Sequence, residues 1–316
     1  MKKALIIGLN NYPGAPLSGC IRDAIKMETV LEKNGDGSPN FDIKLITDEQ
    51  SDITKVNIKE SIEKLFEGND DVALLYFSGH GLIKSTGGYI VTPDYERYDE
   101  GISMDEILTL ANGSNIKDKI IILDCCYSGA FGSPAVISNN CAQLAEGLTV
   151  LTASRNNESA MEVNGSGVFT SLLIDGLQGG AADLRGYITS GSLYAYVDQA
   201  LGPWDQRPIF KTNVSKFTSI RSVKPPVPFE TLRKITDYFE TPEEEFQLDP
   251  SYEFTNEKDA ILENVEIFKD LQKFVANRLV VPVGEEHMYF AAMNSKSCKL
   301  TALGYQYWRL VKEGRV

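Results

Sequence analysis

The sequence is poor in the residues that several classes of protein need. It has two histidines, His80 and His287, and its five cysteines match no zinc ribbon or finger spacing. With 31 basic and 44 acidic residues its net charge is −13, which argues against a generic nucleic-acid binder and favours basic partners. No stretch approaches the ~20 apolar residues that span a bilayer, and the N-terminal apolar run is too short for a signal peptide. We expect a cytoplasmic protein.

Two further absences narrow the function. The segment IIGLNNYPG follows an apolar run as a nucleotide-binding loop would, but it lacks the G-x-G-x-x-G and Walker patterns. In a reducing compartment most cysteines are small buried residues, so any catalytic cysteine needs support from its surroundings. Because imidazoles are scarce, chemistry that joins a cysteine to a histidine has few candidates.

The first two thirds of the chain alternate strand-like and helix-like segments. The apolar runs are typical of buried strands, and they are separated by amphipathic helix patterns. We expect strands at Lys3–Leu9, 43–47, Asp71–Ser78, Lys119–Cys125, Leu148–Ser154 and 207–210. Continuous apolar strands between helices predict an α/β fold, with a mostly parallel sheet covered on both faces.

The last third is different in composition. The proline-rich SVKPPVP and the acidic stretch after it predict a linker over residues 222–256. From 257 to 316 we expect a small αβ domain with the order helix, hairpin, amphipathic helix, in which HMYFAAM belongs to the hairpin. That order is similar to a winged helix. We interpret it as a regulatory domain that binds another protein, and the domain before it as residues 1–221.

Two of the expected strands end in segments that carry reactive side chains. One runs into YFSGHG, which places His80 just past its end, and another into ILDCCYSG. Reactive groups gather at the carboxyl ends of strands in such sheets, so a histidine and a cysteine could meet there. Residues two apart in a strand share a face, so Asp124 and Cys126 point one way and Cys125 the other. Ser78 and His80 share a face by the same argument.

These motifs resemble those of the caspase-like cysteine peptidases, and most of all the metacaspase and orthocaspase branch, whose motifs read S-G-H-G and D-x-C-x-S-G. The likeness covers about residues 3–213 and includes SGCIRDA after the first strand. It implies a caspase-like sheet of about six strands in a prokaryotic type of protein with an added C-terminal domain. One departure is Tyr127, where metacaspases usually have histidine.

The resemblance implies a cysteine endopeptidase with a Cys-His dyad. Cys126 is then the nucleophile and His80 the general acid and base, while the backbone N–H groups of Gly81 and Cys126 hold the oxyanion. Other interpretations of single residues stay open, since His80 could be a core histidine and Asp124 a helix cap. The alternative for the whole chain is a non-catalytic caspase-like scaffold that acts by binding proteins.

The aspartate ahead of the two cysteines suggests what the enzyme recognises. Asp124 should line the pocket for the residue before the scissile bond, and the likeness adds Asp23, with Cys20 and Ser78 nearby. Two carboxylates attract arginine, which they can bind through charge-assisted hydrogen bonds, and then lysine. The partners are then protein substrates with a basic residue at that position. Asp23 could instead cap its helix or pair with Arg22.

Calcium-dependent metacaspases carry several acidic residues after the histidine. Here that region has few, among them Asp94, Asp99 and Glu100, although calcium favours six to eight oxygen ligands. We therefore expect no metal site and no cofactor. The family likeness further implies a role in regulated proteolysis, such as microbial stress or antiviral defence.

Overall fold

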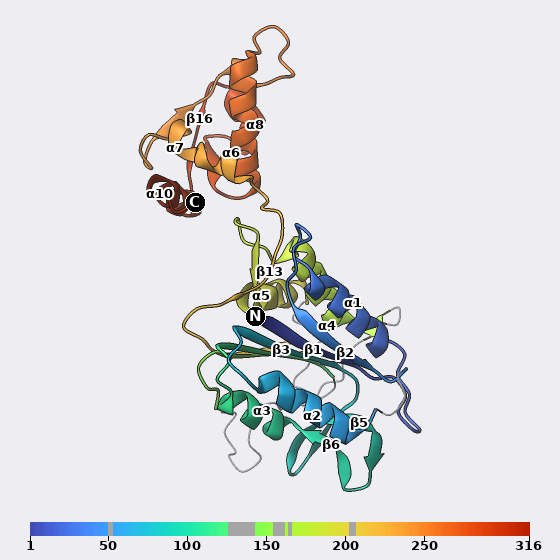
Figure 1. Cartoon of the computed structure of the whole chain (residues 1–316). Helices are drawn as coiled ribbons and strands as arrows, with labels where there is room; N and C mark the ends of the chain where they lie inside the picture. The colour runs from blue at the N-terminus through green and yellow to red at the C-terminus, as the bar shows by residue number, and fades with distance from the viewer. Residues whose placement is uncertain (50–52, 126–142, 154–161, 164–165, 202–206) are drawn as a thin grey trace. The chain divides into compact units, whose positions relative to one another are not determined.

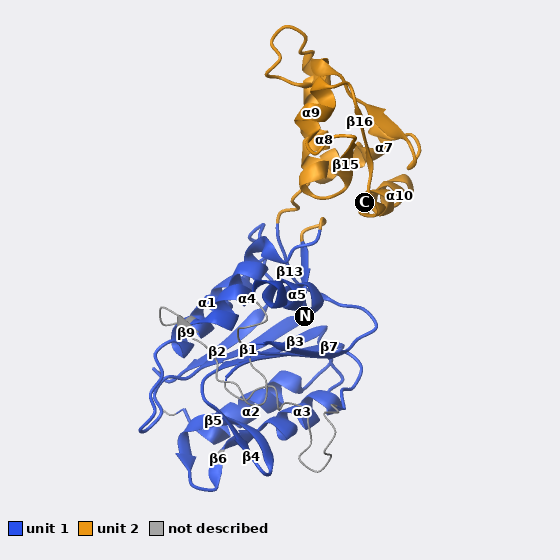
Figure 2. Cartoon of the chain, turned by 180° about the vertical axis from the view of Figure 1, so that it is seen from behind, with its two compact units in different colours: residues 1–183, 187–223 blue, residues 184–186, 224–316 orange. Residues whose placement is uncertain are grey.

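The computed structural model describes residues 1–49, 53–125, 143–153, 162–163, 166–201 and 207–316. The chain divides into two compact units, which Figure 2 draws in different colours. The first consists of Met1–Asp183 and Tyr187–Val223, and the second of Leu184–Gly186 and Lys224–Val316.

Six strands of the described residues form the central sheet of the first unit, in the order β12-β8-β7-β3-β1-β2. All neighbouring pairs are parallel except the edge strand β12, which runs antiparallel to β8. The central strands are apolar on both faces, as the expected sheet requires. The strands are β1 (Lys2–Gly8), β2 (Asp42–Thr47), β3 (Val72–Ser78), β7 (Asp118–Asp124), β8 (Leu148–Thr152) and β12 (Ile209–Asn213).

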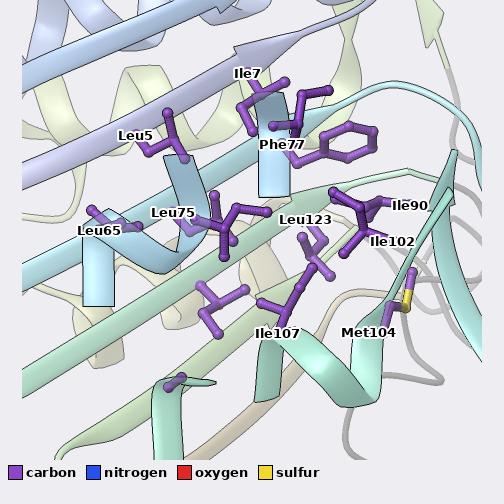
Figure 3. Packing of buried hydrophobic residues seen from close by; sticks show 14 of the residues in the cluster. Leu5, Ile7, Leu65, Leu75, Phe77, Ile90, Ile102, Met104, Ile107 and Leu123 are labelled. Carbon is purple, nitrogen blue, oxygen red and sulfur yellow. The ribbon is translucent and has the colours of Figure 1, made fainter. Parts of the chain in front are cut away.

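Helices cover both faces of this sheet (Figure 1). One face packs against α1 (Cys20–Glu32), α4 (Val168–Asp175) and α5 (Ser190–Ala200), and the other against α2 (Lys55–Phe66) and α3 (Met104–Gly113). Figure 3 shows the hydrophobic core between the sheet and the helices α2 and α3. In this core Leu5, Leu75 and Leu123 of three strands meet Leu65 of α2 and Ile107 of α3. The mixed α/β fold with a mostly parallel sheet is confirmed.

Smaller elements surround the main sheet. An antiparallel sheet of three strands, β4-β5-β6, lies between β3 and α3 in the sequence, and its middle strand carries Ile90 into the core of Figure 3. Its strands are β4 (Gly81–Lys84), β5 (Gly87–Glu96) and β6 (Asp99–Ser103). The described part of this unit also contains two short antiparallel pairs and a π-helix: β9 (Glu162–Val163), β10 (Ser166–Gly167), β11 (Tyr187–Thr189), β13 (Ser219–Ser222) and η2 (Gly176–Gly180).

The second unit has its own core around α8 and an antiparallel sheet in the order β14-β16-β15. Its elements are α6 (Phe229–Arg233), α7 (Ile235–Tyr238), β14 (Glu245–Gln247), η3 (Pro250–Tyr252), α8 (Leu262–Ala276), β15 (Val280–Val283), α9 (Met288–Met293), β16 (Ser297–Leu300) and α10 (Ala302–Lys312).

Two expectations for the C-terminal third were wrong. Residues 222–256 do not form a linker, because Val227, Leu232 and Phe239 are fully buried in the core of the second unit. The segment HMYFAAM is not a hairpin strand, because Met288–Met293 forms helix α9, and β16 is the strand that pairs with β15. The likeness of this unit to a winged helix stays a prediction.

Candidate active site

Three parallel strands of the first unit end side by side. Gly8 of β1 lies opposite Ser78 of β3, and Ser78 lies opposite Asp124 of β7. The chain turns beyond Ser78, where the backbone N–H of Gly79 donates to the carbonyl oxygen of Asp124 over 3.4 Å. His80 is the next residue along the chain. The sheet therefore places His80 beside the segment that leads into Cys126, which itself lies outside the described residues.

Two buried carboxylates converge on Gly167 at the start of α4. The Gly167 N–H donates to Asp23 Oδ2 over 2.7 Å. A methyl group added at Gly167 would lie 3.4 Å from Asp23 Oδ2 and would collide with Asp124 Oδ2. Asp23 belongs to the first turn of α1 and Asp124 to the end of β7, so both predicted pocket residues meet in one place. Asp23 and Asp124 are 2% and 6% exposed.

Asp124 is held by a short chain of hydrogen bonds. Thr170 Oγ1, in the first turn of α4, donates to Asp124 Oδ2 over 2.6 Å and lies 2.7 Å from Tyr76 Oη. Since the single proton of the Thr170 hydroxyl goes to the carboxylate, the proton of the second bond comes from Tyr76. Burial, with the nearby charges of Asp124 and Asp23, raises the pKa of Tyr76 well above its usual range.

Both carboxyl groups lie at the N-terminal end of α4. Gly167 is the N-cap residue of this helix, and its N–H points at Asp23. A helix N-terminus carries a partial positive charge, which stabilises anions within its first turn. The arrangement therefore brings two carboxyl groups together at the start of a helix, in a largely buried site.

His80 is half-buried and is held by the loop that joins β1 to α1. Its Nε2 lies 2.7 Å from the carbonyl oxygen of Ala15. A carbonyl oxygen accepts but cannot donate, so Nε2 carries a proton in this hydrogen bond. Its Nδ1 is then the basic nitrogen of the neutral ring, which is the tautomer that a general base at Nδ1 needs.

The remaining predicted site residues lie around these groups. Cys20 is the first residue of α1, one turn before Asp23, and its N–H donates to Asn10 Oδ1 over 3.0 Å. Ser78 is buried at the end of β3, and Gly81 begins β4 opposite Ile90. Cys125 is buried in the core that contains Leu123, whereas Asp124 contacts Thr170 on the opposite face. The expected alternation of these two residues is confirmed.

Sequence reasoning missed four residues of this site: Tyr12, Ala15, Gly167 and Thr170. Tyr12 and Ala15 belong to IIGLNNYPGA, a segment that we considered only as a nucleotide loop. Gly167 and Thr170 begin an apolar helix pattern, GVFTSLLIDGL, whose register against β7 is not visible in the sequence. A threonine directly after two apolar residues at the start of the helix was the available signal.

Within the described ranges, no three His, Cys, Asp or Glu side chains come together as a metal site would require. Among the helices of those residues, none has the length and apolar character needed to cross a membrane.

Solved structures from a bacterium and an insect have a similar fold. Protein GSU0716 from Geobacter sulfurreducens matches with a TM-score of 0.53 at 17% identity, over 71% of this chain and all of that one. Caspase-1 from Spodoptera frugiperda matches with a TM-score of 0.51 at 13% identity, over 71% of this chain and 90% of that one. At such low identities these matches establish the fold only.

Sequence relatives include fungal metacaspases. Metacaspase-1 of Scheffersomyces stipitis is 36% identical over 88 residues, which cover 25% of this chain and 21% of the relative. Metacaspase-1 of Saccharomyces cerevisiae is 39% identical over 88 residues, covering 25% and 20%, and metacaspase-1A of Aspergillus terreus is 35% identical over 114, covering 34% and 26%. The chain thus matches about a fifth to a quarter of the length of these relatives.

The sheet order and the two strand-end motifs define a caspase-like α/β protein. The model of the caspase domain family matches residues 1–221, about two thirds of the chain and nearly all of the first unit. The chain therefore belongs to the caspase domain family, whose members include cysteine-type endopeptidases, and it resembles the metacaspases within it.

Proposed function

We propose that this chain is a cysteine endopeptidase that cleaves proteins after arginine, and less readily after lysine, through the dyad of Cys126 and His80. The observation that carries the proposal is the convergence of Asp23 and Asp124 on Gly167, beside the strand end that bears His80. Family membership supports the reaction, and the paired carboxylates support the specificity.

His80 acts through Nδ1, because the carbonyl oxygen of Ala15 holds the proton on Nε2. In the proposed reaction, Nδ1 takes the thiol proton of Cys126, and the thiolate attacks the scissile carbonyl to form a tetrahedral intermediate. The N–H groups of Gly81 and Cys126 stabilise its oxyanion. The imidazolium then protonates the leaving amine, and His80 activates water to hydrolyse the acyl-enzyme.

The specificity follows from charge. A guanidinium between Asp23 and Asp124 is attracted by both and can form charge-assisted hydrogen bonds with them. An acidic substrate side chain would be repelled by two carboxylates in a site with little access to water. Cys20 and Ser78 border this pocket from the start of α1 and the end of β3.

A panel of fluorogenic peptides that differ only in the residue before the scissile bond tests this specificity. We expect cleavage after arginine, less after lysine and none after aspartate. Asp23→Ala and Asp124→Ala should each lower kcat/KM for the arginine peptide about 100-fold, because each removes one of the two carboxylates that would bind the buried guanidinium of the substrate. Glu28→Ala, which removes another carboxylate of α1, is the matched control. A preference for aspartate, or wild-type cleavage of arginine peptides by both pocket variants, contradicts the proposal.

The alternative function is a non-catalytic caspase-like scaffold. An activity-based electrophile that carries arginine separates the two. The endopeptidase should be labelled at Cys126, and labelling should disappear in His80→Ala. A scaffold would give equal labelling of wild type and His80→Ala, together with no peptide cleavage by either.

The biological role that we propose is regulated proteolysis, such as microbial stress response or antiviral defence, with the second unit binding a regulatory protein. The support for this is the family likeness and the presence of a second unit with its own core. Mass-spectrometric comparison of cleaved proteins in cells that express wild type or Cys126→Ala would identify the targets. Equal cleavage patterns in the two strains would count against a proteolytic role.

A further inference from the structure

Tyr12 contacts His80 through both its ring and its hydroxyl. The centroids of the two rings lie 4.6 Å apart at an interplanar angle of 64°. The backbone N–H of His80 donates to Tyr12 Oη over 3.1 Å, and Tyr12 Oη lies 3.3 Å from the carbonyl oxygen of Val91, to which it donates. The Val91 N–H in turn donates to the His80 carbonyl oxygen over 2.9 Å. Tyr12, His80 and Val91 thus form a closed ring of hydrogen bonds.

Gly79 packs against the hydroxyl of Tyr12. A methyl group at Gly79 would collide with Tyr12 Oη and would lie 2.7 Å from Phe77 Cζ. The backbone just before the histidine therefore packs directly on the tyrosine hydroxyl, which only a residue without a side chain allows. Tyr12 is itself 3% exposed, so its position is fixed by the core around it.

We propose that Tyr12 is a positioning residue for the catalytic imidazole, an inference that rests on the proposed role of His80. Its hydroxyl fixes the backbone of His80, and its ring fixes the plane of the imidazole. Together with the Ala15 carbonyl, which holds Nε2, Tyr12 fixes the orientation of the ring and with it the position of Nδ1. The aromatic ring is also within the range at which rings attract a cation, and His80 becomes a cation whenever it holds the thiol proton.

Such a residue should affect turnover more than substrate binding. Rate depends steeply on the geometry of the reacting groups, and a misplacement of 1 Å can cost on the order of 100-fold. Tyr12 belongs to the loop before α1, whereas the carboxylates that we assign to substrate binding are Asp23 and Asp124. Loss of Tyr12 contacts should therefore lower kcat and leave KM nearly unchanged.

The test measures kcat and KM with an arginine peptide, well below the melting temperature of every variant. Tyr12→Phe keeps the ring and removes the hydroxyl, and it should lower kcat about ten-fold with KM within about two-fold. Tyr12→Leu removes both contacts and should lower kcat about 100-fold. The matched control is Tyr95→Phe, because the Tyr95 hydroxyl donates to the Pro13 carbonyl on the same loop over 2.8 Å. It should keep kcat within about two-fold.

The outcomes separate this inference from the proposed function. If His80→Ala retains peptidase activity, the dyad itself is wrong. If His80→Ala is inactive while Tyr12→Phe has the kcat of wild type, the dyad stands and the role of Tyr12 is overturned. If Tyr12→Leu unfolds, Tyr12→Phe alone decides, and an equal loss of kcat in Tyr95→Phe would assign the effect to the loop rather than to Tyr12.

Discussion

Asp270 of α8 illustrates how the second unit keeps a buried carboxylate charged. It is 6% exposed and accepts hydrogen bonds from Lys234 Nζ over 2.8 Å, Lys273 Nζ over 3.0 Å and Tyr238 Oη over 3.0 Å. Burial opposes the charge, but the hydrogen bonds from these three side chains outweigh it and lower the pKa of Asp270. The cluster joins α7 and the residue before it to α8.

We predict that Asp270→Asn destabilises the second unit by about 2 kcal/mol at pH 7. Because the folded pKa is lowered, the stabilisation is present above the ordinary carboxyl pKa of about 4 and is lost as the pH falls through the folded value. The difference between wild type and variant should therefore shrink in acid. Denaturant unfolding followed by Trp308 fluorescence in a Trp204→Phe background measures it. The exposed Asp237→Asn is the control, and a pH-independent difference would contradict the assignment.

The part of the candidate site that lies at the ends of strands was predictable from the sequence. His80, Asp124 and Ser78 follow from apolar runs that end in polar residues, because parallel register brings such ends together. Tyr12 and Thr170 were not predictable in this way. Tyr12 reaches His80 from a loop without periodicity, and the contact of Thr170 depends on how α4 docks on the sheet.

At the scale of elements, acidic side chains of β5 and β6, which a calcium ion would need as ligands, bind the first residue of α2 instead. Both carboxylate oxygens of Asp94 accept the backbone N–H of Lys55 at the start of α2, over 3.1 and 2.9 Å. Lys55 Nζ forms an ion pair with Asp99, the first residue of β6. These acidic side chains therefore serve to fasten the small antiparallel sheet to α2.

We predict that peptidase activity does not require calcium. Activity in EGTA and in millimolar calcium should agree within about two-fold, because a calcium ion needs six to eight oxygen ligands and several carboxylates. Stimulation of ten-fold or more by calcium would contradict this. Asp94→Asn, which keeps one oxygen as an acceptor for Lys55, should respond to calcium as wild type does.

The elements of the first unit were easier to predict than those of the second. Buried parallel strands are continuous apolar runs, so β1, β3 and β7 were placed to within one or two residues. In MYFAAM nearly every residue is apolar, and a short run of this kind does not distinguish strand from helix. The structure reveals the helical spacing, since Met288, Ala291 and Ala292 are the buried residues of α9. Proline-rich composition was equally misleading, because Val227 between two prolines is buried.

At the scale of the whole molecule, the first unit ends at Val223, one residue after strand β13. Arg221 donates from Nη1 to the Leu177 carbonyl over 2.6 Å and from Nε to the Lys33 carbonyl over 2.9 Å. The N–H of Ser222 donates to Asn34 Oδ1 over 3.0 Å. These bonds make residues up to Ser222 part of the first unit.

We predict that a chain truncated after Val223 hydrolyses small peptides with the kcat of the full chain, within about two-fold, and loses only control by a regulatory protein. A chain truncated after Thr218 removes β13 and should be markedly less stable. Thermal unfolding and peptide assays on both truncations provide the measurement. Loss of peptide hydrolysis in the longer truncation would mean that the second unit is part of the catalytic fold.

The loop between β1 and α1 has a consequence for any attempt to change the specificity of the proposed peptidase. Within a dozen residues it supplies Tyr12 and Ala15 to His80, and the helix that follows it supplies Asp23 to the proposed specificity pocket. Mutations in this segment should change turnover and selectivity together, since the same stretch of backbone positions residues that affect each. Gly167 and Thr170, at the start of α4, contact the two carboxyl groups of the proposed pocket from a separate part of the chain. Laboratory evolution toward a new cleavage preference should therefore begin there.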